Sequence, residues 1–161
     1  MIPAILKGKN LFVQASVASE KTLSHVIPTL QLINEHTPGC QALVIAPTKD
    51  LSKQISQIYQ SIGEYLKISV ALCVVGPATS ETEWKEGAQI VLGTPGKVCD
   101  KLQKGAFSTD SVRIVILEDL DELLSRGYQD QLTELFKRFP PAAQVGLKIW
   151  GNLFLTDSCF M

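Results

Sequence analysis

The sequence predicts an α/β domain built on a doubly wound parallel sheet with helices on both faces. Short apolar runs alternate with amphipathic helical patterns along the whole chain. The runs are continuous rather than alternating with polar residues, which is typical of parallel strands covered on both faces. The length of 161 residues suits one domain with its own core.

Each predicted element follows from one of these patterns, in chain order. Branched apolar residues dominate the six predicted strands, which are Asn10–Ala15, Cys40–Ala46, Ser69–Val75, Gln89–Gly93, Arg113–Leu117 and Ala143–Leu147. Apolar residues at helical spacing predict helices at Thr22–Asn34 and Leu51–Leu66. A short polar helix is predicted at Glu81–Glu86, a helix entered through Pro95 at Lys97–Gln103, and two short helices between Asp121 and Phe139. Pro28 weakens the first helix, and Gly127 breaks the last pair.

Composition narrows the class of protein. The net charge is −1, so no overall positive field favours nucleic acid, and any RNA contact must come from a local patch. The four scattered cysteines form no CxxC pair, which argues against a disulfide framework or a zinc site. His25 and His36 lack ligand-like spacing and are predicted to be packing or surface residues. No signal peptide or apolar run of about 20 residues is present, so we expect a cytoplasmic protein without a membrane contact, the nucleus being the alternative.

Ligands in doubly wound sheets bind at the carboxyl ends of the strands, so the five loops that follow the first five strands deserve inspection. In order, these loops read ASVASEKT, APTKDL, VGPAT, GTPGK and EDLDELLSRGY. Together, at these spacings, they resemble the first RecA-like domain of DEAD-box ATP-dependent RNA helicases. The stretches QALVIAPTKDLSKQI, GTPGKV and DELLSRGYQDQ are most similar to the translation initiation-factor helicases of the four-A type, and the resemblance covers Ile2 to Leu147.

The resemblance implies a role for each loop. The first wraps the phosphates of ATP, and the fifth holds Mg²⁺ and positions the attacking water. The second, third and fourth grip the RNA backbone. A serine-alanine-threonine triplet after the sixth strand, a glutamine before the first strand and a second RecA-like domain complete the family's machinery, and we expect this chain to lack all three.

The first loop departs from the family pattern. The resemblance makes Ala18, Ser19, Glu20, Lys21 and Thr22 the cofactor-binding residues. Ala18 and Glu20 replace glycines that let backbone N–H groups approach phosphate. A carboxylate about 4 Å from a phosphate charge is repelled by roughly 4 kcal/mol at an effective dielectric of about 20. Either Lys21 and Thr22 still hold phosphate and Mg²⁺, or Ser19 and Glu20 simply cap a helix. ATP and Mg²⁺ binding are predicted to be weak or absent.

The fifth loop carries the acids in an altered order. By resemblance Glu118, Asp119 and Asp121 are the catalytic acids, and Thr22 and Glu118 are the Mg²⁺ ligands. The first two acids are exchanged relative to the family, and Leu120 adds bulk. A misplacement of about 1 Å can cost roughly a hundredfold in rate, so we predict no useful catalysis. The alternative is an acidic helix start, which the helix dipole favours by itself.

The loops that the resemblance assigns to RNA are better preserved. The residues concerned are Pro47, Thr48, Lys49, Asp50, Gly76, Thr94, Pro95, Gly96 and Lys97. Lys49 and Lys97 replace arginines, so each can neutralise a phosphate but loses the bidentate fork. The alternative is structural, because Thr-Pro and Pro-Gly also make good helix starts and turns.

The chain is expected to divide into a RecA-like domain at 1–147 and a divergent tail at 148–161, whose apolar residues would need cover. Three hypotheses for function follow. In the first, the chain is a degenerate helicase domain that binds RNA weakly and in a salt-dependent way, or that binds a partner such as the initiation-complex scaffold protein. In the second, it is a working ATP-dependent helicase fragment. In the third, it is a pseudogene-like product without a role. The lost glycines favour the first over the second.

Overall fold

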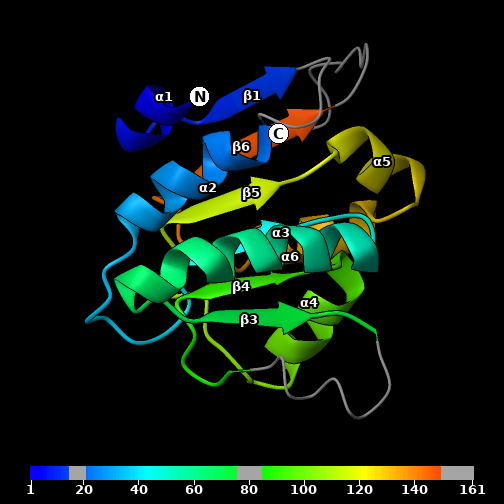
Figure 1. Cartoon of the computed structure of the whole chain (residues 1–161). Helices are drawn as coiled ribbons and strands as arrows, with labels where there is room; N and C mark the ends of the chain where they lie inside the picture. Colours follow the sequence, from blue (N-terminus) through cyan, green and yellow to red (C-terminus); the bar gives the residue numbers. More distant parts are fainter. Residues whose placement is uncertain (15–20, 76–84, 150–161) are drawn as a thin grey trace.

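The computed structural model describes residues 1–14, 21–75 and 85–149, which form one six-stranded sheet with helices on both faces (Figure 1). The strands are β1 (Leu11–Gln14), β2 (Ala42–Ile45), β3 (Val70–Cys73), β4 (Ile90–Gly93), β5 (Ile114–Leu117) and β6 (Gln144–Ile149). They lie in the order β1-β6-β5-β2-β4-β3, and every neighbouring pair is parallel. The predicted doubly wound parallel sheet is therefore confirmed.

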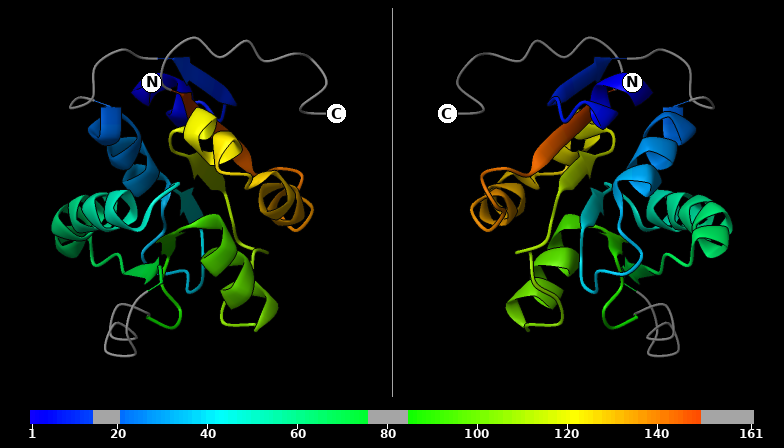
Figure 2. Two further views of the ribbon diagram at one scale, coloured as in Figure 1. Left: turned by 90° about the vertical axis from the view of Figure 1, so that its right-hand side faces the viewer. Right: turned by 90° about the vertical axis from the view of Figure 1, so that its left-hand side faces the viewer.

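Helices cover the sheet in two layers (Figure 2). The helices are α1 (Ile2–Leu6), α2 (Lys21–Leu32), α3 (Lys49–Gly63), α4 (Pro95–Gln103), α5 (Leu120–Ser125) and α6 (Gln129–Phe136), with a 3₁₀ turn, η1, at Glu64–Leu66. One apolar core joins the sheet to α1, α2 and α3, and a second joins it to α4, α5 and α6. Strands β2 to β5 are buried at every position, as their continuous apolar runs predicted.

The alternation of side chains along β5 decides which layer each residue meets. Ile114 and Ile116 belong to the core under α2 and α3, whereas Val115 and Leu117 belong to the core under α4 to α6. Successive side chains on a strand point to opposite faces. The next residue, Glu118, therefore points toward α2.

The structure departs from the sequence-based expectation at several places. Helix α1 was not predicted. Helix α2 runs through Pro28, as its predicted range requires, but ends at Leu32 rather than Asn34. Strand β6 runs to Ile149, two residues past the predicted end of the sixth strand, with Lys148 and Ile149 paired to Val13 and Gln14. Of the helix predicted at Glu81–Glu86, residues 85 and 86 are not helical, and the remainder lies outside the described residues.

Close backbone packing fixes one glycine at the end of β4. A Cβ atom on Gly93 would lie 2.1 Å from the carbonyl oxygen of Cys73 on β3, so no larger residue fits there without movement of the strands. Cys40, Cys73 and Cys99 are buried and free. Within the described ranges, no helix combines the length and the apolar character that crossing a membrane requires.

Candidate functional site

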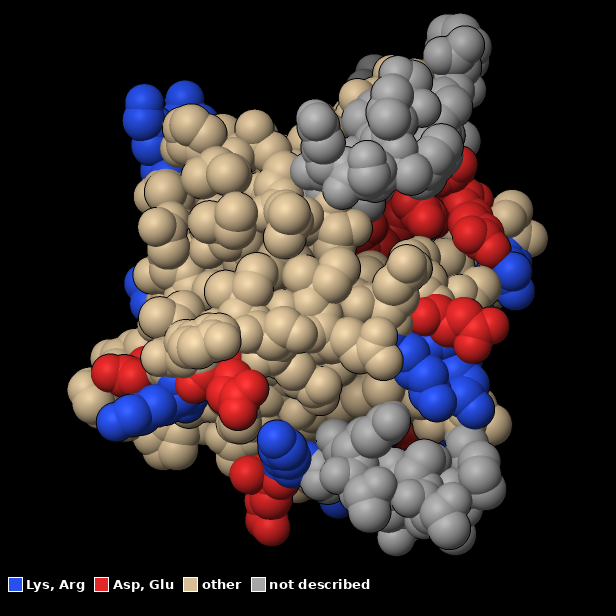
Figure 3. Space-filling model, in the orientation of Figure 1, with Lys and Arg blue, Asp and Glu red and all other residues tan. Residues whose placement is uncertain are grey.

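All six strands point their carboxyl ends to one edge of the sheet, where the arrowheads in Figure 1 lie. The strand order divides this edge in two. We call the ends of β1, β6 and β5, with the start of α2 and residues 118–121, the acidic half. We call the ends of β2, β4 and β3, with residues 47–50 and 94–97, the lysine half. Figure 3 shows acidic side chains gathered beside the start of α5, and Lys or Arg side chains lower along the same edge.

Glu118, the first acid of the fifth loop, lies inside the protein. Its side chain is 1% exposed, and its backbone N–H donates to the carbonyl of Ile45 at 2.8 Å, which continues the β5–β2 pairing. Its Oε1 lies 2.7 Å from Nε2 of His25 on α2, whose side chain is fully buried. The carboxylate thus faces a protein group, not solvent.

His25 links this acid to a third helix. Its Nδ1 lies 3.1 Å from the hydroxyl of Tyr59 on α3, which is also fully buried. Burial raises the pKa of the Tyr59 phenol above its ordinary value, and the nearby Glu118 charge acts in the same direction. Glu118, His25 and Tyr59 therefore form a buried polar chain, which we call the EHY chain. The prediction that His25 is a plain packing residue missed its polar contacts.

The residues present do not fit a magnesium ion at Glu118. Mg²⁺ is held through one or two carboxylates and keeps several water molecules. The Glu118 carboxylate is closed off from solvent, and an imidazole nitrogen already lies 2.7 Å away. Over residues 1–14, 21–75 and 85–149, no three His, Cys, Asp or Glu side chains are grouped so as to hold a metal.

The other two acids of the loop lie at the start of α5. Asp119 has a left-handed backbone, with φ 48° and ψ 58°, a conformation that aspartate tolerates better than most residues. Asp121 lies in the first turn of α5 and is half-buried, as is Glu122. Negative side chains at a helix start are favoured by the helix dipole. Asp119 and Asp121 thus lie at the start of α5, whereas the Glu118 side chain points into the protein.

In the lysine half, the second loop starts α3. Thr48 caps this helix, because its hydroxyl accepts a hydrogen bond from the N–H of Leu51 at 3.2 Å. Pro47 is buried, Lys49 is half-buried and Asp50 is exposed in the first turn. The Thr48 hydroxyl therefore has a structural role, and Lys49 and Asp50 are the side chains that remain accessible.

The fourth loop starts α4 on the adjacent strand. The Thr94 backbone N–H donates to the carbonyl of Cys73 at 3.1 Å, and its side chain makes no capping hydrogen bond. Pro95 occupies the first turn, as the fixed φ of proline favours, and Gly96 has open space around the position of a Cβ atom. Because β2 and β4 are neighbours, the starts of α3 and α4 lie next to each other at this edge.

Several predicted site residues fall at or beyond the limits of what the structure describes. Ala18, Ser19, Glu20 and Gly76 lie outside the described residues. Helix α2 begins at Lys21, and Thr22 is half-buried in its first turn.

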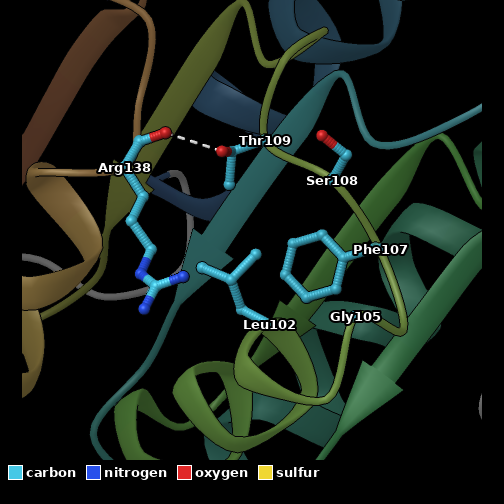
Figure 4. A pocket seen from close by; sticks show the side chains of 6 residues that line it. All are labelled: Leu102, Gly105, Phe107, Ser108, Thr109 and Arg138. Atoms are coloured by element: carbon cyan, nitrogen blue, oxygen red, sulfur yellow. Dashed lines mark hydrogen bonds between the residues drawn. The ribbon is translucent and has the colours of Figure 1, made fainter.

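Two cavities in the described part of the chain lie away from this edge. One of about 480 Å³ is lined by Leu102, Gly105, Phe107, Ser108, Thr109 and Arg138, and Thr109 donates to the carbonyl of Arg138 at 2.6 Å (Figure 4). The other, of about 520 Å³, is lined by residues 30–36, 66, 68 and 113. Both lie toward the amino ends of the strands, opposite the loops described above.

The DEAD/DEAH box helicase family model matches residues 1–148, nearly the whole chain. The chain belongs to this family. The ATP-dependent RNA helicase eIF4A of Neosartorya fischeri is 37% identical over 145 residues, which are 89% of this chain and 36% of that protein. The chain thus spans about a third of the length of this relative. Its sheet and helices form a RecA-like domain.

Solved structures agree with the DEAD-box assignment. A DEAD box protein from the hyperthermophile Methanococcus jannaschii superimposes with a TM-score of 0.80 at 29% identity, over 92% of this chain and 41% of that chain. Saccharomyces cerevisiae Dbp5, solved bound to RNA and ADP BeF3, gives a TM-score of 0.79 over 94% of this chain and 38% of its own. At 24% identity, the second comparison supports the fold alone.

Proposed function

We propose that this DEAD-box domain contacts the RNA backbone weakly through the lysine half and does not hydrolyse ATP as this chain. The observation that carries the proposal is the inward position of Glu118. An acid that is 1% exposed and 2.7 Å from a buried histidine is not available to position a metal-bound water. The exchanged acids of the loop and the missing glycines at positions 18 and 20 point the same way.

The RNA part of the proposal rests on the lysine half. Two helix starts lie next to each other on adjacent strands, each with a lysine in its first turn, Lys49 and Lys97. Backbone N–H groups at a helix start and a neighbouring cation both favour phosphate. Gly96 has space in front of it for a close backbone approach. The relative eIF4A is an ATP-dependent RNA helicase, and the shared family supports RNA as the ligand here.

The proposal extends to the cofactors, the location and the partner of the protein. ATP and Mg²⁺ bind weakly or not at all, given Glu20 in the phosphate loop. A cytoplasmic role beside the translation-initiation helicases, in contact with their scaffold protein, is consistent with the similarity to eIF4A.

The test is a titration of fluorescently labelled single-stranded RNA with the full chain at several salt concentrations, together with an assay of phosphate release from Mg²⁺–ATP. We expect weak binding whose logarithm falls linearly with the logarithm of salt concentration, and no RNA-stimulated phosphate release. RNA-stimulated hydrolysis that disappears in a Glu118→Gln variant would favour the working-helicase hypothesis. An absence of RNA binding even at low salt would overturn the RNA part of the proposal.

A further inference from the structure

The EHY chain joins three elements that are far apart in the sequence. Glu118 follows β5, His25 lies in the second turn of α2 and Tyr59 lies near the end of α3. All three residues are buried among the apolar side chains between the sheet and these two helices. A polar group in such a place costs free energy unless it has a partner. Each polar group of the EHY chain therefore needs a partner that the protein itself supplies.

The contacts allow the hydrogen positions to be assigned. Burial raises the pKa of the Tyr59 phenol, so the hydroxyl keeps its proton. That hydroxyl lies 3.1 Å from Nδ1 of His25 and can donate to it, which leaves the ring proton on Nε2. Nε2 is the nitrogen that lies 2.7 Å from Glu118 Oε1. Tyr59 thus orients the imidazole so that a positive edge faces the carboxylate.

A buried carboxylate needs a partner that carries a positive charge or donates a hydrogen bond. A hydrated divalent cation is one such partner, but the surroundings of Glu118 exclude it. We propose that His25 is a positioning residue, whose Nε2 edge holds the Glu118 carboxylate inside the protein, in the place where a hydrated metal ion would otherwise meet it. This inference rests on the proposed absence of ATP hydrolysis and supplies its physical cause.

The first test uses thermal unfolding of the full chain. Removing a polar partner from a buried carboxylate is strongly destabilising, so His25→Leu is expected to lower Tm by about 10 °C. His25→Gln keeps an N–H donor and should recover at least half of that loss. A merely space-filling histidine would give the opposite order, because leucine would fit the apolar surroundings better than glutamine. That opposite order would overturn the proposal.

The chain offers a matched control in its other histidine. His36 Nε2 lies 3.5 Å from a Glu35 oxygen, but its side chain is 87% exposed. Exposed ion pairs contribute little, so His36→Leu should change Tm by less than about 3 °C. An equal loss in both leucine variants would mean that the buried contact has no special role.

The second test asks directly about metal and needs only the native chain and Glu118→Gln. Free Mn²⁺, followed by its electron paramagnetic resonance signal, stands in for Mg²⁺. We expect both proteins to leave the same fraction of Mn²⁺ free, because His25 and not a cation partners Glu118. Mn²⁺ binding by the native chain that is lost in Glu118→Gln would overturn the proposal, even if the His25 variants failed to fold.

The two proposals fail in different ways. RNA titrations on the same samples report on the lysine half alone, so a native chain that binds no RNA would refute that part of the function while leaving the Tm and Mn²⁺ results intact. Phosphate release by a native chain that binds no Mn²⁺ at Glu118 would refute the proposed lack of hydrolysis and leave the His25 contact standing.

Discussion

The two halves of the carboxyl edge share one sheet and one strand direction, yet they treat their polar residues differently. In the lysine half, Thr48 caps α3 with its side chain, and Lys49 and Lys97 keep partial access to solvent. In the acidic half, Glu118 is turned inward onto His25. The fold therefore fixes where the loops lie, while single side chains decide whether a loop faces a ligand or the core.

The largest expected effect comes from restoring the two glycines of the first loop. An Ala18→Gly/Glu20→Gly variant removes a carboxylate whose repulsion of phosphate is worth roughly 4 kcal/mol. Calorimetric titration with ATP should show no heat for the native chain and an affinity up to about a thousandfold higher for the variant. Glu86→Gly, an exposed site before β4, removes the same charge elsewhere and should change nothing. Micromolar ATP binding by the native chain would show that Glu20 is tolerated.

The next largest expected effect is on stability, at the two glycines of the lysine half. Gly93→Ala places a Cβ 2.1 Å from a backbone oxygen, so urea unfolding should show a loss of about 3 kcal/mol or more. Gly96→Ala meets nothing within 4 Å and lies in a helical turn, so stability should stay the same or rise slightly. If phosphate approaches Gly96, the same change should weaken RNA binding. Equal destabilisation by both would mean that the tight contact at Gly93 is absent.

The two threonines that start α3 and α4 make a smaller, matched comparison. Thr48→Val removes a capping hydrogen bond and should cost about 1 kcal/mol of unfolding free energy. Thr94 makes no capping bond with its side chain, so Thr94→Val should stay within about 0.5 kcal/mol. Chemical denaturation of the two variants measures the difference. A reversed order would show that the α4 hydroxyl, not the α3 hydroxyl, is structurally engaged.

The smallest expected effect is on the salt dependence of RNA binding. Lys97→Gln should reduce the slope of log affinity against log salt by about 0.7, the value for one lost phosphate contact on a single strand. Lys137, exposed after α6, gives a charge-matched control in Lys137→Gln that should leave the slope unchanged. Identical slopes for Lys97→Gln and the native chain would remove Lys97 from the RNA interface.

Most of the fold could be predicted because strands β2 to β5 are continuous apolar runs and the long helices have a clear apolar face. Helix α1 escaped prediction because five residues give too little periodicity, and it is held by packing of Ile5 into the core under α2. Element ends differed by a few residues, as at α3, where the Thr48 cap sets the start before the first periodic leucine.

Only the features of the site that depend on local sequence patterns could be predicted. The loops and their acids follow strands, so their place at one edge could be inferred. The contact between His25 and Glu118 could not, because it depends on which strand lies beside which. Strand β5 lies two places from β1 in the sheet, with β6 between them. The one available signal was a histidine at an inward position of α2, the same helix face as Val26 and Leu30 in the buried core.

The most direct test of the contrast between the two halves is RNA affinity of the native chain with and without Mg²⁺–ATP, measured by fluorescence anisotropy at low salt. If the lysine half acts alone, the RNA dissociation constant will be the same in both conditions. A rise in RNA affinity with Mg²⁺–ATP that is lost in Glu118→Gln would contradict the account, since it would mean that the acidic half still binds nucleotide and communicates with RNA.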